Sequence, residues 1–276
     1  LDVDRLALPP EGFAPVQLAV LEEKADRKLV EGLLNATLPE KVAAEKKIKS
    51  GVRRVYTDPG LRCPRTYLKL VRRLHAAGLV KFTTECECRV GMFAVKKKND
   101  EQRLVLDCRY SSCHFSDPPK VQLASGQSFA SIGVERQQVW LGNVDIKVAF
   151  YAMQLPAELL KYFGLPYDVR AGDVGVSQLW SDSVADYTPI HPDTRIVPVF
   201  AAIPMGWTHS LAVCQAVLEG LSRKVAGITA DNALVDRKIA PAIDPSRATL
   251  ITSLSLPKRL KAVSYTHLTL PTTPYV

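Results

Sequence analysis

Hydrophobic residues recur at helical spacing in the N-terminal part of the chain. The segment Val16–Ala36 predicts an amphipathic helix, because apolar positions every three or four residues form one stripe. That stripe consists of Leu18, Leu21, Ala25, Leu29 and Leu33.

Glu40–Arg54 is rich in lysine, and we interpret it as a solvated helix rather than as a dedicated nucleic-acid site. A third helix is predicted from Pro64, a residue that suits a first turn, to a C-terminal cap at Gly78. Its expected inward residues are Tyr67, Leu68, Val71 and Leu74.

The pattern changes at residue 79, where short runs of β-branched and apolar residues begin. Leu79–Thr84, Gly91–Val95 and Arg103–Leu106 predict strands. The polar sequence KKKNDEQ separates the last two runs and is typical of a hairpin turn. The sequence therefore predicts a β-hairpin with a basic tip.

The second half mixes strand, loop and helix patterns. Ser116–Ser131 is expected to be a loop, because Asp-Pro-Pro and Ser-Gly interrupt it. Val139–Ile146 predicts a strand, and the polar segment Pro166–Ile196 predicts a surface insertion. Thr208–Val225 predicts a helix with Leu211, Cys214, Val217, Leu218 and Leu221 on one face. These elements together predict the α+β fold class.

Composition and charge narrow the class of protein. The chain has 276 residues, of which 47% are hydrophobic, a fraction typical of a folded protein. It has neither an apolar stretch long enough to span a bilayer nor a signal-peptide pattern, so we expect an intracellular protein, nuclear or cytoplasmic and not secreted. The net charge of +8 favours a polyanionic partner.

Six cysteines without a secretory segment indicate free thiols in a reducing compartment. Zinc binding is the alternative for one set of residues, although their spacing fits no familiar zinc finger. The set is Cys86, Cys88, Cys108, Cys113 and His114.

Three sequence blocks carry the candidate chemistry. Met92–Arg109 reads MFAVKKKNDEQRLVLDCR, Asp145 begins DIKVAFYAMQLP, and Ile203–Trp207 reads IPMGW. In this order, the blocks resemble the fingers and palm of a reverse transcriptase, over roughly residues 79–250. The resemblance implies template-directed transfer of deoxynucleotides, with deoxynucleoside triphosphates and an RNA or DNA template with its primer as partners.

The resemblance also implies a metal site. Two Mg²⁺ ions held by carboxylates steady the attacking and leaving oxygens in nucleotide addition. Asp145 corresponds to the first metal-binding aspartate and the backbone carbonyl of Ile146 to a second ligand. Phe150 corresponds to the aromatic residue that excludes a ribose 2′-hydroxyl by collision. The residues themselves leave alternatives open: Asp145 as a helix N-cap and Phe150 as a core residue.

The nucleotide-binding residues follow from the other two blocks. By the family pattern, Lys97 corresponds to the lysine at the γ-phosphate and Arg103 to the arginine at the α-phosphate. A solvated turn is the alternative for the lysine run. Gly206 is expected to let backbone approach the nucleotide, and Met205 replaces a glutamine that is common in retroviral enzymes. Asp107 and Arg109 are expected to be structural partners.

One block of the family pattern is missing, because no Tyr-x-Asp-Asp sequence occurs in the chain. We expect a fragment that is inactive as given, with the true N-terminus also missing. The segment Val263–Thr272, VSYTHLTLPT, resembles the translation of a sequencing adapter. The expected divisions are a helical extension (1–78), fingers (79–125), a partial palm (126–262) and the adapter translation (263–276).

Two other functions stay open from the sequence. A non-catalytic basic remnant would bind nucleic acid without dependence on Mg²⁺. An unrelated α+β enzyme would use Asp145 only as a helix cap.

Overall fold

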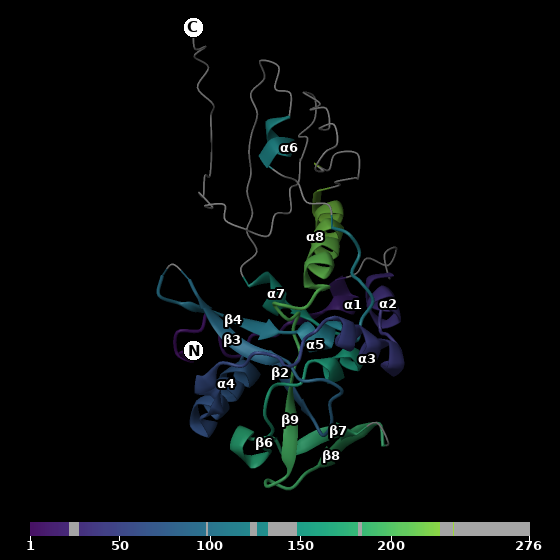
Figure 1. Cartoon of the computed structure of the whole chain (residues 1–276). Coiled ribbons are helices and arrows are strands. Elements are labelled where there is room, and N and C mark those ends of the chain that lie inside the picture. Colours follow the sequence, from purple (N-terminus) through teal and green to yellow (C-terminus); the bar gives the residue numbers. More distant parts are fainter. Residues whose placement is uncertain are drawn as a thin grey trace. The chain divides into compact units, whose positions relative to one another are not determined.

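The computed structural model describes residues 1–21, 28–97, 99–121, 126–131, 148–181, 184–226 and 234. They combine helices and strands, as the α+β prediction expects (Figure 1). The chain divides into two compact units, one of Leu1–Pro119 with Val148–Cys214 and one of Lys120–Lys147 with Gln215–Val276. The predicted boundaries at residues 79, 126 and 263 stay predictions. Within the described ranges, no helix is both long and apolar enough to cross a membrane.

Helical residues occupy most of the described part of the predicted helix Val16–Ala36, and its residues 22–27 lie outside the described residues. The N-terminal helices are α1 (Leu18–Leu21), α2 (Lys28–Asn35) and α3 (Glu40–Lys49). Val16 and Gln17 are not helical, because they form strand β1 and pair in parallel with β5 (Met153–Gln154). The α3 helix ends at Lys49 rather than at Arg54 and buries only Ala43, so it is a solvated helix as expected.

Helix α4 (Pro64–Ala76) packs one face into the core. Leu70 is buried there, and Leu68 is only partly buried, so the prediction that Leu68 points inward is wrong. Gly78 ends the helix with φ of 69° and donates its amide to the His75 carbonyl at 2.9 Å. A side chain at Gly78 would lie 2.5 Å from the Phe13 carbonyl oxygen, which explains the glycine.

The predicted hairpin is confirmed as β3 (Gly91–Lys96) and β4 (Gln102–Asp107), which pair antiparallel. The edge of β4 that faces away from β3 is also paired with other segments. At one end the Ala7 amide donates to the Gln102 carbonyl at 2.8 Å. At the other end the Leu106 amide donates to the Met205 carbonyl at 2.9 Å. With β3 on its other edge, β4 is therefore hydrogen-bonded along both of its edges.

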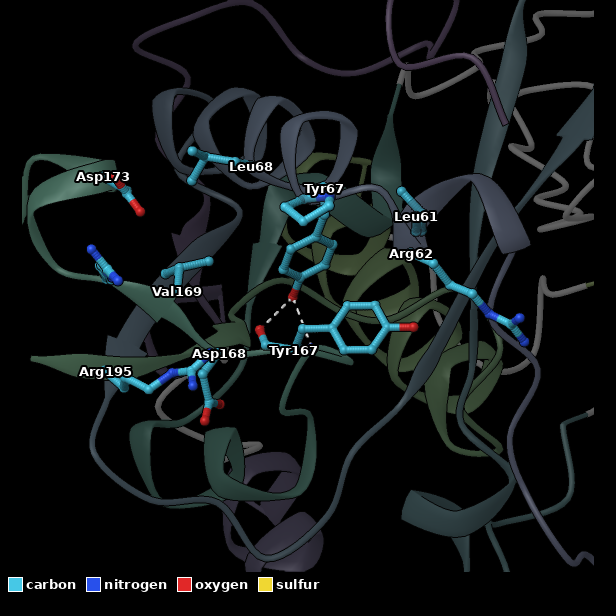
Figure 2. A pocket seen from close by; sticks show the side chains of 11 residues that line it. Leu61, Arg62, Tyr67, Leu68, Tyr167, Asp168, Val169, Asp173 and Arg195 are labelled. Carbon is cyan, nitrogen blue, oxygen red and sulfur yellow. Dashed lines mark hydrogen bonds between the residues drawn. The ribbon is translucent and has the colours of Figure 1, made fainter.

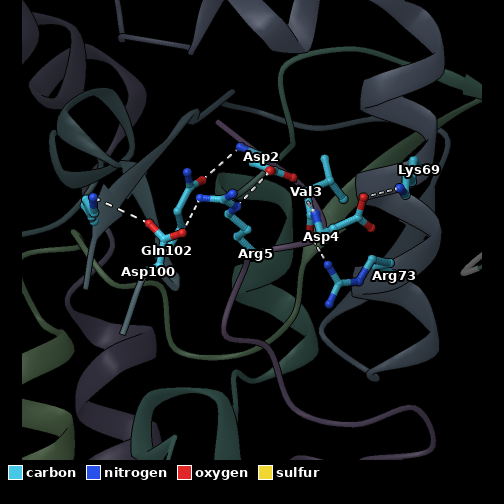
Figure 3. Close-up of polar contacts among 9 residues, drawn as sticks. Asp2, Val3, Asp4, Arg5, Lys69, Arg73, Asp100 and Gln102 are labelled. Atoms are coloured by element: carbon cyan, nitrogen blue, oxygen red, sulfur yellow. Dashed lines mark hydrogen bonds and ion pairs between the residues drawn. The ribbon is translucent and has the colours of Figure 1, made fainter. Parts of the chain in front are cut away.

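The N-terminal segment connects this hairpin to α4 (Figure 3). Arg5 pairs with Asp100 at the hairpin tip at 2.5 Å. Asp4 pairs with Lys69 of α4 at 2.6 Å, and the Val3 carbonyl accepts from a guanidinium of the same helix. The first five residues therefore cross-link the tip of the hairpin to the helix, mostly through exposed groups that contribute little each.

A three-stranded sheet has β9 (Arg195–Phe200) at its centre, between β2 (Val80–Thr83) and β6 (Val169–Arg170). Pro198 lies within β9, and its carbonyl accepts from the Leu165 amide at 2.8 Å. Proline has no amide to return that bond. The Leu165 carbonyl instead accepts from the Arg89 guanidinium at 2.8 Å, and the same guanidinium pairs with Asp168 at 2.6 Å.

The predicted surface insertion contains regular structure. Strands β7 (Gln178–Ser181) and β8 (Asp186–Pro189) form a hairpin, and η3 (Gly172–Val174) precedes it. Trp180 and Tyr187 pack edge to face with ring centroids 5.5 Å apart, and both are more than half exposed. These exposed rings agree with the predicted surface position of this segment.

The remaining elements include one correction and one confirmed helix. Gly126–Ala130 forms the short helix α6, so the predicted loop from Ser116 to Ser131 is wrong at this point. The predicted helix at Thr208–Val225 is confirmed as α8 (Ser210–Ala226). Its buried residues include Val213, Cys214 and Val217, whereas Leu211, Leu218 and Leu221 are only partly buried. The predicted strand Val139–Ile146 lies outside the described residues.

The short elements that remain are α5 (Arg109–Ser112), α7 (Ala149–Ala152), η1 (Pro59–Arg62) and η2 (Ala157–Tyr162). An aromatic cluster forms part of the core beside them. Trp207 lies at its centre, with ring centroids 5.1 Å from Phe115 and 5.3 Å from Phe163. This packing anchors the residues that follow β9.

Candidate nucleotide-binding site

The two expected phosphate-binding cations lie at different places on the β3–β4 hairpin. Lys97 follows β3 at the tip, and its ammonium pairs with Glu101 at 2.6 Å. Arg103 lies opposite Val95 in the β3–β4 register, and its side chain is exposed. No carboxylate lies within ion-pair distance of Arg103 in the part of the chain that the structure describes. Arg103 is therefore available to an anion, whereas Lys97 has an internal partner.

The segments that carry the sequence blocks meet along β4. The Tyr151 hydroxyl lies 3.5 Å from the Leu104 carbonyl oxygen, to which it donates. The Ile203 amide donates to the Met153 carbonyl at 2.9 Å, which joins the segment after α7 to the segment after β9. With the bond from Leu106 to Met205, these contacts bring together three segments that are far apart in sequence.

Two neighbouring aromatic residues on α7 have different environments. Tyr151 is buried and packs against Phe200, with ring centroids 6.3 Å apart. Burial raises the pKa of the Tyr151 hydroxyl to about 12, and the positive charge of Arg103 opposes that shift. Phe150 is only partly buried. The core aromatic of this block is therefore Tyr151, which the sequence patterns did not single out, whereas Phe150 as a residue is only partly buried.

Gly206 has a structural reason to be glycine. Its φ is 129°, a value that side-chain-bearing residues rarely adopt. A Cβ at this position would lie 2.0 Å from the Leu106 carbonyl oxygen. In the structure, the backbone of Gly206 therefore lies close to the backbone of β4 at Leu106. Met205 beside it is partly buried and contributes its carbonyl to the same contact. Nucleotide contacts of Met205 and Gly206 stay a prediction.

Asp107 and Arg109 form the expected structural pair. The Arg109 guanidinium donates to both carboxylate oxygens of Asp107, at 2.8 and 2.6 Å, and the Tyr56 amide donates to one of them at 2.7 Å. Burial alone would raise the pKa of the Asp107 carboxyl, but these hydrogen bonds outweigh it and hold the pKa below its usual value. The pair anchors the segment before α4 to the end of β4.

The resemblance implies Mg²⁺, but its expected ligands Asp145 and Ile146 lie outside the described residues. Within the described ranges, no group of three or more His, Cys, Asp or Glu side chains could hold a metal ion. The cysteines and the histidine considered for zinc binding are among the residues to which this finding applies. Burial raises the pKa of the Cys88 thiol to about 12 and that of Cys108 well above its usual value. Burial therefore disfavours the thiolate form that zinc requires.

A separate cavity of about 420 Å³ lies in the same unit, between the start of α4 and the β6–η3 segment (Figure 2). Tyr67 of α4 donates its hydroxyl to the Tyr167 carbonyl at 2.8 Å, and the two rings pack edge to face. Arg170 and Arg195 also line this cavity. The sequence patterns do not indicate this cavity, because most of its wall comes from the predicted surface insertion Pro166–Ile196, whose last residues begin β9.

Comparisons with known proteins find a similarity at the level of structure. No protein-family model matches the chain, and no curated protein matches it. A solved structure of the foamy viral protease-reverse transcriptase dRH in complex with ds DNA is similar, with a TM-score of 0.43 and 12% sequence identity. The similarity covers 83% of this chain and 39% of that one, so the chain spans well under half of the viral protein in that structure.

Proposed function

We propose that the chain is part of a retroelement RNA-directed DNA polymerase, with the fingers and part of the palm of a reverse transcriptase. The observation that supports this most is the meeting of three motif-bearing segments on β4. The basic hairpin, the segment after Val148 and the IPMGW segment are joined by hydrogen bonds at Leu104, Leu106 and Met153.

In this proposal Arg103 binds the triphosphate of an incoming deoxynucleotide. A guanidinium donates in a planar fork that matches phosphate oxygens, and Arg103 is exposed without an internal partner among the described residues. Lys97 would exchange its pairing with Glu101 for the nucleotide. Phe150, which is only partly buried, would exclude the 2′-hydroxyl of a ribonucleotide. Mg²⁺, with Asp145 and Ile146 as its expected ligands, would supply charge neutralisation of the phosphates.

The chain as given should not extend a primer. Two metal ions need shared carboxylate ligands, and the sequence has Asp145 but no Tyr-x-Asp-Asp block. Weak, salt-sensitive binding to a primer–template should persist, because the basic side chains that attract phosphates are present.

Nucleotide binding tests the proposal directly. Titration with dATP should give a dissociation constant that Arg103→Gln raises by about tenfold or more, since a charged hydrogen bond contributes roughly 1.5–3 kcal/mol. Arg65→Gln removes another exposed charge, from the first turn of α4, and is the matched control. Equal affinity of both variants and the unchanged chain would refute a role for Arg103.

Primer extension in Mg²⁺ or Mn²⁺, with Asp145→Asn alongside, tests the expected inactivity. Extension that depends on Asp145 would contradict it and would direct attention to Asp231 or Asp244 as the second carboxylate.

Helix α3 supports a second candidate function, a non-catalytic nucleic-acid-binding surface. The helix exposes Lys41, Lys47 and Lys49, and the Lys47 ammonium lies 4.0 Å from the centre of the Tyr110 ring. Binding of a duplex that weakens with salt, needs no Mg²⁺ and is lost in a Lys41→Gln, Lys49→Gln variant would favour this function. Dependence of binding on added dATP and Mg²⁺ would favour the polymerase instead.

A further inference from the structure

Two arginines face each other across the strands at the wall of the 420 Å³ cavity. Arg170 of β6 and Arg195 of β9 are partners in the antiparallel register, and both line the cavity. Side chains at directly opposed positions stand on the same face of a sheet, with their Cβ atoms about 4.5–5.5 Å apart. The two guanidinium groups therefore start from neighbouring points on one wall.

The charges of this pair are poorly compensated within the protein. Arg170 is 3.7 Å from Asp193, and both of those side chains are largely exposed. Arg195 has no ion-pair partner in the described part of the chain. Like charges placed directly opposite each other destabilise a sheet. An anion between the two guanidinium groups would remove that repulsion.

The rest of the wall suits an organic group. Tyr67, Leu68, Tyr167 and Val169 line the cavity with aromatic and apolar surface. Figure 2 shows the Tyr67 and Tyr167 rings side by side, between Arg195 on one side of the view and Arg62 on the other. A volume of about 420 Å³ lies within the range of small-molecule pockets, roughly 300–1,000 Å³. A ligand here would have an anionic end at the arginine pair and an apolar or aromatic body.

The two carboxylates of the wall do not cancel the arginine pair. Asp168 already pairs with Arg89 at 2.6 Å, which neutralises it. Asp173 lines the cavity with an exposed side chain, and among the described residues it forms no ion pair with Arg170 or Arg195. Its carboxylate can accept from hydroxyl groups of a ligand but repels a second anionic group nearby. The cavity therefore favours a ligand with a single anionic end.

We propose that this cavity binds an organic phosphate monoester, with the phosphate held between Arg170 and Arg195 and the organic group against Tyr67 and Tyr167. A phosphate has three oxygens and close to two negative charges, so it can accept from two guanidinium forks at once. A carboxylate has two oxygens and one charge and satisfies the pair less completely. This site is independent of the proposed triphosphate site at Arg103.

Calorimetric titration of the full chain with three probes tests the proposal. Phenyl phosphate should bind more tightly than ribose 5-phosphate, because its ring can pack on the tyrosines, and inorganic phosphate should bind most weakly. Arg195→Gln should weaken phenyl phosphate binding by about tenfold or more, since it removes one of two charged forks. Arg65→Gln, an exposed arginine outside the cavity, should leave it unchanged. Arg103→Gln should also leave it unchanged.

Thermal unfolding without ligand separates a binding role from a structural one. Arg195→Gln should unfold at the same or a higher temperature than the unchanged chain, because it relieves repulsion from Arg170. A lowered unfolding temperature would assign Arg195 to the structure and overturn the proposal. Equal losses of phenyl phosphate binding in Arg195→Gln and Arg65→Gln would show that only the overall charge of the chain matters, and would overturn the proposal. The absence of measurable binding heat at millimolar phenyl phosphate would also overturn it. Displacement of the probe by an oligonucleotide in the unchanged chain but not in Arg103→Gln would place the probe at the polymerase site instead.

Discussion

Replacement of Gly206 by alanine should destabilise the fold through one identifiable contact. The added Cβ would lie 2.0 Å from the Leu106 carbonyl oxygen, far inside any normal separation. That oxygen belongs to the backbone of β4, so no flexible side chain can move away to make room. Relief requires the segment around Met205 to shift away from the strand, and this lengthens or breaks the bond from the Leu106 amide to the Met205 carbonyl.

The expected loss follows from two contributions. A residue with a side chain at φ of 129° costs roughly 1–3 kcal/mol relative to glycine. Loss of one backbone hydrogen bond adds about 0.5–1.5 kcal/mol. We therefore expect Gly206→Ala to lower the free energy of unfolding by about 1.5–4.5 kcal/mol, a large share of the stability of an ordinary domain.

Urea denaturation followed by circular dichroism measures this loss as a lower midpoint at an unchanged slope. Gly32→Ala is the matched control, because Gly32 lies in α2 and a methyl group added there would meet no atom within 4 Å. Alanine there should stabilise the helix by about 0.5–1 kcal/mol. Equal midpoints for Gly206→Ala and the unchanged chain would refute the reasoning and would return Gly206 to a purely ligand-binding explanation.

Three further predictions concern other parts of the same unit. Asp107→Asn should lower the free energy of unfolding by about 1.5–3 kcal/mol, because Arg109 loses a charged partner. The pKa of Asp107 is lowered in the folded state, so its contribution to the free energy of unfolding is complete above about pH 4 and is lost as the pH falls through the folded pKa. Denaturation at several pH values should therefore show the stabilities of the unchanged chain and of Asp107→Asn converging in acid. Tyr67→Phe should cost about 1 kcal/mol in urea denaturation, because the Tyr167 carbonyl loses its donor, and an unchanged midpoint would contradict this. Phe150→Ala should raise the affinity for ATP relative to dATP in competition titrations, and an unchanged ratio would remove Phe150 from sugar selection.

The hairpin and the longer helices could be predicted from sequence because local signals agree there. In β3 and β4, apolar runs flank a polar turn, and the structure pairs them as expected. The strand β9 was missed because Pro198 interrupts its apolar run, and proline normally argues against a central strand. Val16 fits the helical stripe of its neighbours, but pairing with Met153 makes it a strand residue, and a distant partner cannot be deduced from local periodicity.

Some residues of the candidate site could likewise be predicted before the structure was known, and others could not. The resemblance to reverse transcriptases singled out Arg103 and Gly206, and the structure joins their segments through β4. The burial of Tyr151 rather than of its neighbour could not be predicted, because either aromatic fits a core position from sequence alone. The pairing of Arg170 with Arg195 depends on the register of a strand that the sequence did not indicate.

The proline in β9 has a consequence for which substitutions the chain can tolerate. Arg89 acts as a substitute donor for the amide that Pro198 lacks, and it also holds Asp168. The two positions are therefore thermodynamically coupled. With proline at 198, loss of Arg89 leaves the Leu165 carbonyl without its hydrogen-bond donor. With a residue at 198 that has a backbone amide, β9 could donate this hydrogen bond itself, and the loss of stability on removing Arg89 should be smaller. Sequence drift at either position is thus constrained by the other, although the two lie more than 100 residues apart.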